Sequence, residues 1–237
     1  MAKYGIIGAM ETEISLLKQQ MQQSGEVKET KAGSLNFFEG TISGKQIVLV
    51  KSGVGKVNAA LCAQRLILQF GVDAVINTGI AGAMGGNLKI FDMVASSDAL
   101  YHDVQAVAFG YKETEIPQMS CSDFKADEVL VKKAVAAFEA VNKNPERKIV
   151  VGRVATGDQF IADKETKNHI KEVCSPVCVE MEGAGIAHAC YLNNVPYLIL
   201  RAISDMADET VEQTYSFNED TAAQISAGLL LELIKSL

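Results

Sequence analysis

Short apolar runs alternate with helical patterns along almost the whole chain of 237 residues. The apolar runs are rich in Val, Ile and Leu, as buried strands are, and the segments between them repeat apolar residues at helical spacing. This alternation predicts an α/β fold. The predicted strands are Tyr4–Gly8, Leu35–Phe38, Gln46–Val50, Ala74–Asn77, Met93–Ala95, Ile149–Ala155, Val177–Val179 and Tyr197–Ile203. The predicted helices are Glu11–Gln22, Lys56–Phe70, Ala126–Val141, Lys164–Glu172, Gly183–Leu192 and Glu219–Lys235.

Two local signals refine this layout. Leu35–Gly40 and Lys45–Val50 are joined through Ser43-Gly44, a pattern that predicts a hairpin and therefore a mixed rather than a purely parallel sheet. Ser216, followed three residues later by Glu219, predicts a capping box at the start of the last helix. Because no linker, low-complexity tract or internal repeat interrupts the pattern, we expect a single domain over residues 1–237.

Composition argues against several classes of protein. With 48% apolar and 22% charged residues, the chain has the composition of a globular protein with a sizeable core. A net charge of −7 and only four, scattered arginines disfavour nucleic-acid binding, which needs clustered basic residues. No apolar stretch reaches the length of a membrane span, and the first apolar run is too short for an export signal. We therefore expect a cytoplasmic protein that binds neither nucleic acid nor membranes.

The cysteines also fit a cytoplasmic protein. They are five, an odd number, and lie mostly in apolar contexts, which fits reduced thiols in a protein core. Cys174 and Cys178 could be metal ligands, but they lack a second pair at zinc spacing, and the three histidines are dispersed. The sequence therefore predicts no metal site.

Two glycine-rich segments resemble nucleotide-binding loops without meeting their requirements. Ser52–Val57 lacks the early glycine of a P-loop and the Ser or Thr after the lysine, because Val50 and Val57 occupy those places. Gly79–Gly85 follows a strand but has Ala81 where the dinucleotide fingerprint needs its second glycine. Both segments are expected to be tight turns after strands, either with a ligand close to the backbone or with no ligand role.

Acidic residues stand at the ends of two apolar runs. Glu180 and Glu182 end one run, and Asp205 ends another that contains Arg201. In α/β proteins the carboxyl ends of strands open onto the ligand crevice. Acids that converge there serve acid–base catalysis or bind a hydroxyl-rich substrate. This pattern indicates an enzyme.

Several segments, taken in order, resemble the motifs of one enzyme family. The segments are Gly5–Glu13, Lys51–Lys56, Asn77–Gly82, Tyr101–Asp103, Ala108–Tyr111, Thr156–Ile161, Val179–Glu182, Arg201–Asp205 and Ser216-Phe217. Over essentially the whole chain they resemble bacterial 5′-methylthioadenosine/S-adenosylhomocysteine nucleosidases, within the purine nucleoside phosphorylase superfamily. The resemblance implies an α/β/α sandwich of three layers around a mixed, partly barrel-like sheet, and a homodimer. It also implies hydrolysis of the adenine–ribose bond of 5′-thio-substituted adenosines, with no metal or organic cofactor.

Hydrolysis of this bond needs an acid for the departing base and a base for the attacking water. The resemblance assigns the acid at adenine N7 to Asp205, which must keep its proton through burial and which Ser204 could orient. Taken alone, Asp205 could instead be a helix N-cap. Glu13 resembles the base that activates water, although its local pattern fits a solvated glutamate in a first helical turn. Glu11 is the neighbouring alternative and points to another face of the helix.

The ribose is expected to meet two neighbouring residues. The resemblance assigns the 2′-hydroxyl to the Glu182 carboxylate and places Met181 along the ribose and 5′-substituent, although Met181 could be a core methionine. Strand alternation would point these two side chains to opposite faces, so both can reach the ligand only if the strand ends there. Arg201 resembles the arginine that positions the water with Glu13, and it could also hold Glu182 or Glu180 in an ion pair. Glu180 is expected to be structural or to support Arg201.

Further residues are assigned to the substrate by the resemblance alone. Phe160 is expected to stack on adenine while the backbone of Ile161 reads the base edge, and in isolation both could be core residues at a strand end. An apolar pocket would suit the 5′-thio group and poorly accommodate a 5′-hydroxyl. The other residues expected around the substrate are Ala9, Met10, Val54, Ile80, Phe217 and, from the partner subunit, Phe109.

The main rival reaction uses phosphate instead of water. Phosphorylases of this superfamily surround phosphate with arginines and a serine, whereas here no arginine precedes Arg65 and the early loop carries Glu11 and Glu13. Ile80 stands where many nucleosidases carry serine, and its side chain cannot donate to phosphate. The sequence therefore favours hydrolysis. Two alternatives stay open, a non-catalytic protein that binds purine nucleosides and futalosine-type hydrolysis on the same scaffold.

Overall fold

The structure is a computed structural model that describes residues 2–85, 87–208 and 211–237, with the backbone alone for residues 211–217. Strands and helices alternate along the chain, as the sequence predicts. The strands are β1 (Lys3–Gly8), β2 (Lys28–Ala32), β3 (Leu35–Ile42), β4 (Lys45–Lys51), β5 (Ala74–Ala83), β6 (Met93–Tyr101), β7 (Asp123–Lys125), β8 (Ile149–Thr156), β9 (Cys178–Glu180) and β10 (Tyr197–Asp205). The helices are α1 (Glu11–Ser24), α2 (Lys56–Phe70), the short 3-10 helix η1 (Val107–Phe109), α3 (Glu128–Val141), α4 (Lys164–Cys174), α5 (Gly183–Asn193) and α6 (Val211–Ser236).

Five strands close into a barrel-like ring. β10 pairs in parallel with β5 and antiparallel with β6, so it joins the two ends of the strand order β6-β8-β9-β5. Outside the ring, β1 lies parallel between β5 and β4, and β3 and β2 continue the sheet antiparallel. The expected mixed, partly barrel-like sheet is therefore confirmed.

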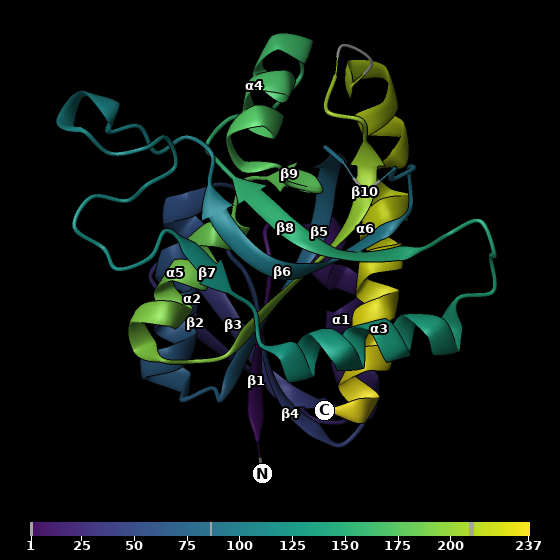
Figure 1. The fold of residues 1–237 in the computed structure, drawn as a ribbon. Coiled ribbons are helices and arrows are strands. Elements are labelled where there is room, and N and C mark those ends of the chain that lie inside the picture. The colour runs from purple at the N-terminus through teal and green to yellow at the C-terminus, as the bar shows by residue number, and fades with distance from the viewer. Residues whose placement is uncertain (1, 86, 209–210) are drawn as a thin grey trace.

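Helices cover the sheet on two sides (Figure 1). α2 packs on α5 on one side, and α1, α3 and α6 pack together on the other. α4 stands beyond the end of β8, next to β9. Among the described residues, no helix is both long enough and apolar enough to cross a lipid bilayer.

The central strands are apolar because helices or neighbouring strands cover both of their faces. All ten residues of β5 and all nine of β10 are buried. The buried residues of α2 recur at helical spacing and include Ala59, Cys62 and Leu66. The charged residues inside these buried elements therefore stand out as a departure from the core pattern.

The predicted hairpin is confirmed. β3 and β4 pair antiparallel around Ser43 (φ 49°) and Gly44 (φ 76°), and two residues with positive φ are what a tight hairpin turn of this kind requires.

Several predicted boundaries are wrong. The segment from Gly79 was expected to be a turn, but β5 continues through it to Ala83, because the glycines make room for neighbouring side chains. The last helix begins at Val211, so no capping box at Ser216 starts it. β2 and β7 were not predicted, since KETKA and DFK are short and show no apolar alternation; both are positioned by strand pairing, and β7 also by the buried Phe124.

Candidate active site

One cleft of about 550 Å³, open space at its mouth included, gathers the ends of several strands. It lies where β5, β9 and β10 end, and the segments that follow β1, β4 and β8 complete its wall. This is the edge at which α/β folds place ligands. The lining residues are Ala9, Met10, Glu13, Val54, Ile80, Ala81, Gly82, Gln159, Phe160, Ile161, Val179, Glu180, Met181, Glu182, Arg201, Ser204 and Asp205.

Arg201, on β10, lies at the centre of a buried charge cluster. Its side chain is only 1% exposed, and Nη2 donates to a Glu180 carboxylate oxygen, to Glu182 Oε2 at 3.3 Å and to Asn77 Oδ1 at 2.6 Å. Nη1 donates to the carbonyl of Ile80 at 3.3 Å and lies 3.9 Å from Glu13 Oε1. One guanidinium therefore serves three carboxylates. Both readings of Arg201 from the sequence, as a partner of Glu13 and as an ion pair, are compatible with this geometry.

Gly79, on β5, makes this cluster possible. A Cβ atom at this position would come within 2.2 Å of Arg201 Nη1 and 2.4 Å of Glu13 Oε1. Such distances are far below van der Waals contact, so a side chain at this position would displace Arg201 and Glu13 from the arrangement described here.

Glu13 is buried rather than solvated. Its Oε2 accepts from the backbone N–H groups of Ala9 at 2.6 Å and Met10 at 3.0 Å, and its Oε1 accepts from that of Ile80 at 3.1 Å. Burial raises the pKa of Glu13, and the charge of Arg201 together with these N–H groups offsets part of that increase. The result is a carboxylate that is fixed in position and more basic than usual. The exposed Glu11 does not line the cleft.

β9 ends at Glu180, so the condition set by the sequence is met: Met181 and Glu182 both line the cleft. Glu182 Oε1 accepts from the backbone N–H of Gly55 at 3.0 Å, just before α2. The pKa of Glu182 is raised from 4.5 to about 7, mainly by burial; Arg201 lowers it and the neighbouring charge of Glu180 raises it further. Glu182 can therefore exchange a proton near neutral pH.

Asp205 is the last residue of β10, at a point where the pairing with β5 shifts register. Its Oδ2 accepts from the Ser204 hydroxyl at 2.8 Å and its Oδ1 from the Ala207 backbone N–H at 2.8 Å. Since α6 begins at Val211, Asp205 is not the N-cap of that helix. Burial raises the pKa of Asp205, against the lowering effect of its two hydrogen bonds. The approach of Gly82, where a Cβ would lie 2.8 Å from Oδ1, leaves space for this carboxyl group.

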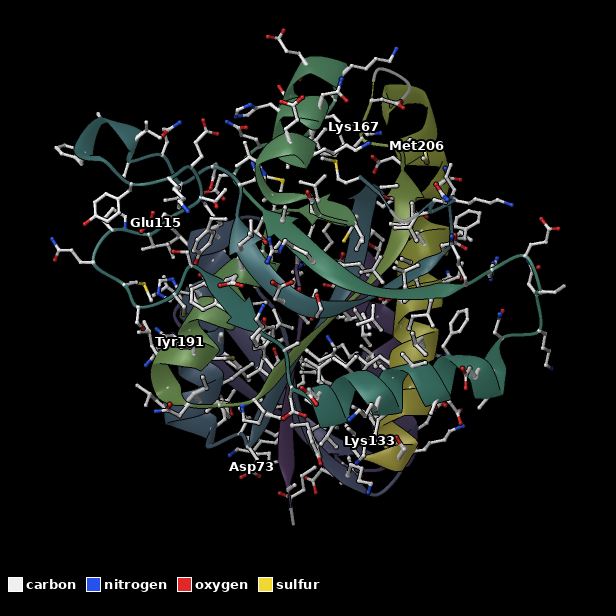
Figure 2. All side chains as sticks on the ribbon, in the orientation of Figure 1. Asp73, Glu115, Lys133, Lys167, Tyr191 and Met206 are labelled. Atoms are coloured by element: carbon white, nitrogen blue, oxygen red, sulfur yellow. The ribbon has the colours of Figure 1, made fainter. Side chains whose placement is uncertain are left out.

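The segment after Asp205 is tied to α4. Lys167 on α4 donates from Nζ to the carbonyl of Met206, and Figure 2 shows the two residues side by side. The charge of Lys167 also lowers the pKa of Asp205, although by less than the two hydrogen bonds do.

The remaining predicted residues have three different outcomes. Phe160 and Val54 line the cleft and are half exposed, and Ile161 lines it from a buried position. Phe109, in η1, is 85% exposed and is not part of the lining. The side chain of Phe217 lies outside the described residues.

Several residues of the site were not singled out by the sequence. Asn77 is fully buried; its Nδ2 donates to the carbonyl of Ile7 at 3.0 Å while its Oδ1 accepts from Arg201. The sequence did offer one signal for Asn77, since a polar amide in the middle of the apolar run Ala74–Ala83 needs buried hydrogen-bond partners. Thr156 and Gln159 carried no such signal, because threonine is common in strands and glutamine in loops.

No group of three or more His, Cys, Asp or Glu side chains suited to a metal ion occurs in the described ranges. Cys174 and Cys178, the pair considered from the sequence, are buried free thiols.

Comparison with known proteins gives one consistent answer. The family model of the Phosphorylase superfamily matches residues 3–235. The chain is 41% identical over 236 residues to the 5′-methylthioadenosine/S-adenosylhomocysteine nucleosidase of Listeria monocytogenes serotype 4b, covering 98% of this chain and 99% of the relative.

Solved structures agree. The nucleosidase of Neisseria meningitidis in complex with methylthio-immucillin-A superposes with a TM-score of 0.93 at 37% identity, with complete coverage of both chains. The futalosine hydrolase of Helicobacter pylori superposes with a TM-score of 0.92 at 32% identity, covering 100% of this chain and 98% of the other. The chain therefore belongs to the 5′-methylthioadenosine/S-adenosylhomocysteine nucleosidase family of the phosphorylase superfamily.

Proposed function

We propose that the cleft hydrolyses the N-glycosidic bond of 5′-methylthioadenosine and S-adenosylhomocysteine, releasing adenine and the 5-thio-ribose product. The observation that carries this proposal is the pair of buried carboxyl groups with raised pKa, Glu13 and Asp205, in one cleft. Glycosidic hydrolysis needs such a pair, since one group gives a proton to the leaving group and the other takes one from water. The relatives named above supply the substrate class.

Asp205 is the general acid in this proposal. Adenine is a poor leaving group as an anion, so N7 must receive a proton or a strong hydrogen bond while the bond to ribose breaks. Burial keeps the proton on Asp205 at higher pH than usual. The Ser204 hydroxyl and the Ala207 N–H fix the direction in which the carboxyl group points.

Glu13 is the general base. The ribosyl carbon becomes cationic as adenine leaves, and a water molecule held between Glu13 and Arg201 attacks it. The three backbone N–H groups that hold the Glu13 carboxylate preorganise it, and its raised pKa makes it a better proton acceptor. Glu13 thus takes one proton from water as Asp205 gives one to adenine, and exchange with solvent restores both groups.

Glu182 and Met181 bind the ribose. An ionised Glu182 accepts a hydrogen bond from the 2′-hydroxyl, and its charge stabilises the cationic ribosyl group. A 2′-deoxyribose would leave this buried carboxylate unpaired and would be rejected. Phe160 stacks on adenine and the backbone of Ile161 reads its edge.

Apolar residues receive the 5′-thio group. Ala9, Met10 and Val54 line the cleft together with Ile80, and Phe217 and the partner's Phe109 complete this pocket in the proposal. A thioether is better accommodated there than a hydroxyl, which would lose its hydrogen bonds to water.

Phosphate does not replace water in this reaction. Arg201 is the only arginine or lysine among the described residues that line the cleft, and it is engaged by carboxylates. Three buried carboxyl groups beside it would repel an entering phosphate.

Product analysis tests the reaction. The protein is incubated with 5′-methylthioadenosine in phosphate-free buffer and again with phosphate, and the products are separated. We expect adenine and 5-methylthioribose at the same rate in both buffers. Methylthioribose 1-phosphate as the main product would replace the hydrolase with a phosphorylase, and no turnover of any nucleoside would favour a binding protein.

Futalosine-type hydrolysis is the second candidate, because a futalosine hydrolase is similar over the full chain. It breaks the same type of bond and needs the same acid and base. Parallel rates with 5′-methylthioadenosine, S-adenosylhomocysteine and aminofutalosine rank the substrates, and a strong preference for aminofutalosine would make this candidate the function.

We also infer that the protein, one domain over residues 1–237, acts as a homodimer. Val57, Leu61 and Leu68 form an exposed apolar stripe along α2, and Leu192 of the adjoining α5 is exposed too. An apolar stripe of this kind is costly in water and favours association. α2 begins at Lys56, immediately after the cleft residue Val54, so a second copy on the stripe lies close to the cleft mouth.

The segment between β6 and β7 projects on the side of α2 and α5 (Figure 1) and carries the exposed Phe109. Phe109→Ala should raise KM for 5′-methylthioadenosine several-fold without dissociating the dimer. Light scattering that finds a fully active monomer would remove both inferences.

A further inference from the structure

The charges around Arg201 do not balance. Glu13, Glu180 and Glu182 surround one guanidinium, and all four side chains are almost completely buried. If every carboxyl group were ionised, the cluster would carry two net negative charges out of contact with bulk water. Because burial of unpaired charge is costly, the cluster is expected to hold at least one proton. Glu182, whose pKa is raised to about 7, keeps this proton below neutral pH and loses it above, and the contacts of Arg201 set that balance.

Glu180 is the carboxylate with the most donors. Its Oε2 accepts from Arg201 and from the backbone N–H groups of Glu182 at 3.1 Å and Gly183 at 2.8 Å. These two N–H groups open α5, where the helix dipole also favours an anion.

Thr156 supplies the fourth donor, to Glu180 Oε1. The Thr156 oxygen itself accepts from the backbone N–H of Ala184 at 2.8 Å, which directs the hydroxyl proton toward Glu180. Donors to both oxygens and a guanidinium in contact therefore fix the Glu180 carboxyl group in position beside Arg201.

The two carboxyl groups assigned to the substrate make longer contacts with Arg201 than Glu180 does. Glu182 receives one backbone N–H and a longer contact to Nη2, at 3.3 Å. Glu13 receives three backbone N–H groups, but Nη1 stays 3.9 Å away.

We propose that Glu180 is a positioning residue for catalysis: it holds Arg201 in an ion pair anchored by Thr156, so that Glu13 and Glu182 face the substrate without a full counter-ion. This inference rests on the proposed function. Without the Glu180 charge, Arg201 would turn to the two remaining carboxylates and weaken both as proton acceptors. Glu180 touches neither water nor sugar in this role and acts through Arg201.

The pKa shift of Glu182 agrees with this arrangement of contacts. Glu182 faces Glu13 from α1, Glu180 from β9 and Arg201 from β10, with the Gly55 N–H as its backbone donor. Its pKa is raised to about 7, mainly by burial; Arg201 lowers the pKa, and the charges of Glu180 and Glu13 raise it. Loss of the Glu180 charge therefore acts in one direction only, toward a lower pKa of Glu182.

Glu180→Gln tests the proposal with little change of shape. The amide oxygen can accept from Arg201 and from the two N–H groups of α5, and the amide NH2 can donate to Thr156, whose hydroxyl can rotate. We expect the acid limb of the pH profile of kcat/KM for 5′-methylthioadenosine to move about one pH unit toward acid. We expect kcat on the plateau to fall about tenfold, because Glu13 becomes a weaker base.

Asp98→Asn is the matched control. Asp98 is also a buried carboxylate paired with an arginine, Arg153, but it lies on β6 and does not line the cleft. This variant should lower the melting temperature and leave the pH profile unchanged. If Glu180→Gln does not fold, Thr156→Val removes the anchoring hydroxyl and should shift the limb in the same direction by a smaller amount.

A second readout separates this inference from the proposed function. The side-chain carboxyl carbons of the ligand-free protein are labelled with ¹³C, and the Glu182 signal is titrated by NMR in the wild type and in Glu180→Gln. A lower midpoint in the variant supports the inference whether or not any nucleoside is cleaved. Coincident titration curves, or an active wild type whose pH profile overlays that of Glu180→Gln, would overturn it while leaving the hydrolase intact.

Discussion

Two clusters of acidic and basic side chains surround buried carboxylates in this molecule, and they differ in charge balance. Asp98 is nearly inaccessible and accepts from Arg153 Nη2 at 2.7 Å and Nε at 3.1 Å and from Lys125 Nζ at 3.2 Å. Asp123 shares both cations, at 2.9 Å from Lys125 Nζ and 3.5 Å from Arg153 Nη2, so two carboxylates meet two cations there. At the cleft, Arg201 is one cation among three carboxylates.

The directions of the pKa shifts agree with this difference in charge balance. Burial alone would raise the pKa of Asp98, but the hydrogen bonds from Arg153, Ser97 and Lys125 together bring it below its usual value. At Glu13 and Glu182 the effect of burial exceeds the lowering effect of Arg201 and the backbone N–H groups, so the pKa values of both are raised. A buried ion pair therefore indicates a site of proton transfer only where cations are too few.

Asp205 extends the comparison, because it is buried with no cation bonded to its carboxyl oxygens among the described contacts. Asp205→Asn should give the largest effect: turnover of 5′-methylthioadenosine falls by about 10²–10⁴-fold, because the amide cannot deliver a proton. The fold should survive, since the amide oxygen can accept from the Ala207 N–H and the NH2 group can donate to the Ser204 hydroxyl.

The measurement compares two substrates in this variant. A 5′-methylthioriboside with a 4-nitrophenyl leaving group needs little protonation, so its turnover should fall much less than that of 5′-methylthioadenosine. Equal losses for both substrates would mean that Asp205 shapes the cleft and does not act as the acid.

Glu13→Gln should give the next largest effect, a loss of turnover of about 10²-fold from the missing base. The contacts add a structural consequence. Both Glu13 oxygens accept from backbone N–H groups, so an amide NH2 must face a donor on one side. We therefore expect weaker binding of a 5′-thioadenosine inhibitor as well, measured by calorimetry. Near-normal turnover would move the base to Glu182.

Glu182→Gln should make the protein more stable above neutral pH. Wild-type Glu182 keeps its proton in the folded state up to about pH 7, whereas the unfolded chain loses it near 4.5. The folded state binds more protons between these values, so the stability contributed by Glu182 is present below pH 4.5 and is lost as pH rises through 7. Gln mimics the protonated form, and its advantage at pH 8 should be roughly 2–3 kcal/mol.

Asp98→Asn should show the opposite pH dependence. Its folded-state pKa is lowered, so its contribution is present above the unfolded pKa and is lost as pH falls through the folded pKa. The variant should be roughly 2–3 kcal/mol less stable at pH 7 and approach the wild type in acid. Urea unfolding of both variants from pH 4 to 8 provides the test. Parallel curves for the two variants would mean that the clusters do not differ.

The sequence predicted the layout of the fold better than the extent of its strands. Eight strands and six helices were expected near their observed positions because their apolar periodicity is strong. The continuation of β5 through Gly79 was missed, since glycine usually ends a strand, and here it makes room for Arg201 and Glu13. That reason is tertiary and leaves no local signal.

The charged site shows a similar limit. The acids at strand ends pointed to a cleft, and motif resemblance selected Glu13, whose local pattern fits an exposed helical residue. The division of Arg201 among three carboxylates depends on the closure of β5 and β10, which brings Asn77 and Glu180 to the same guanidinium. No spacing along the chain reveals that contact.

The smallest expected effect tests whether a distant cation tunes the acid. Lys167→Met removes the tether from α4 to Met206 and a positive charge that lowers the pKa of Asp205. We expect kcat to fall roughly two- to fivefold, as the segment after Asp205 loosens, and the alkaline limb of the pH profile to rise by a few tenths of a unit. The exposed Lys171, on the same helix, serves as the control, and Lys171→Met should change neither quantity. If kcat falls while the alkaline limb stays in place, the role of Lys167 is to hold the segment after Asp205 and not to tune the pKa of Asp205. A variant identical to the wild type in both measurements would mean that Lys167 affects neither the proton affinity of Asp205 nor the position of the segment that follows it.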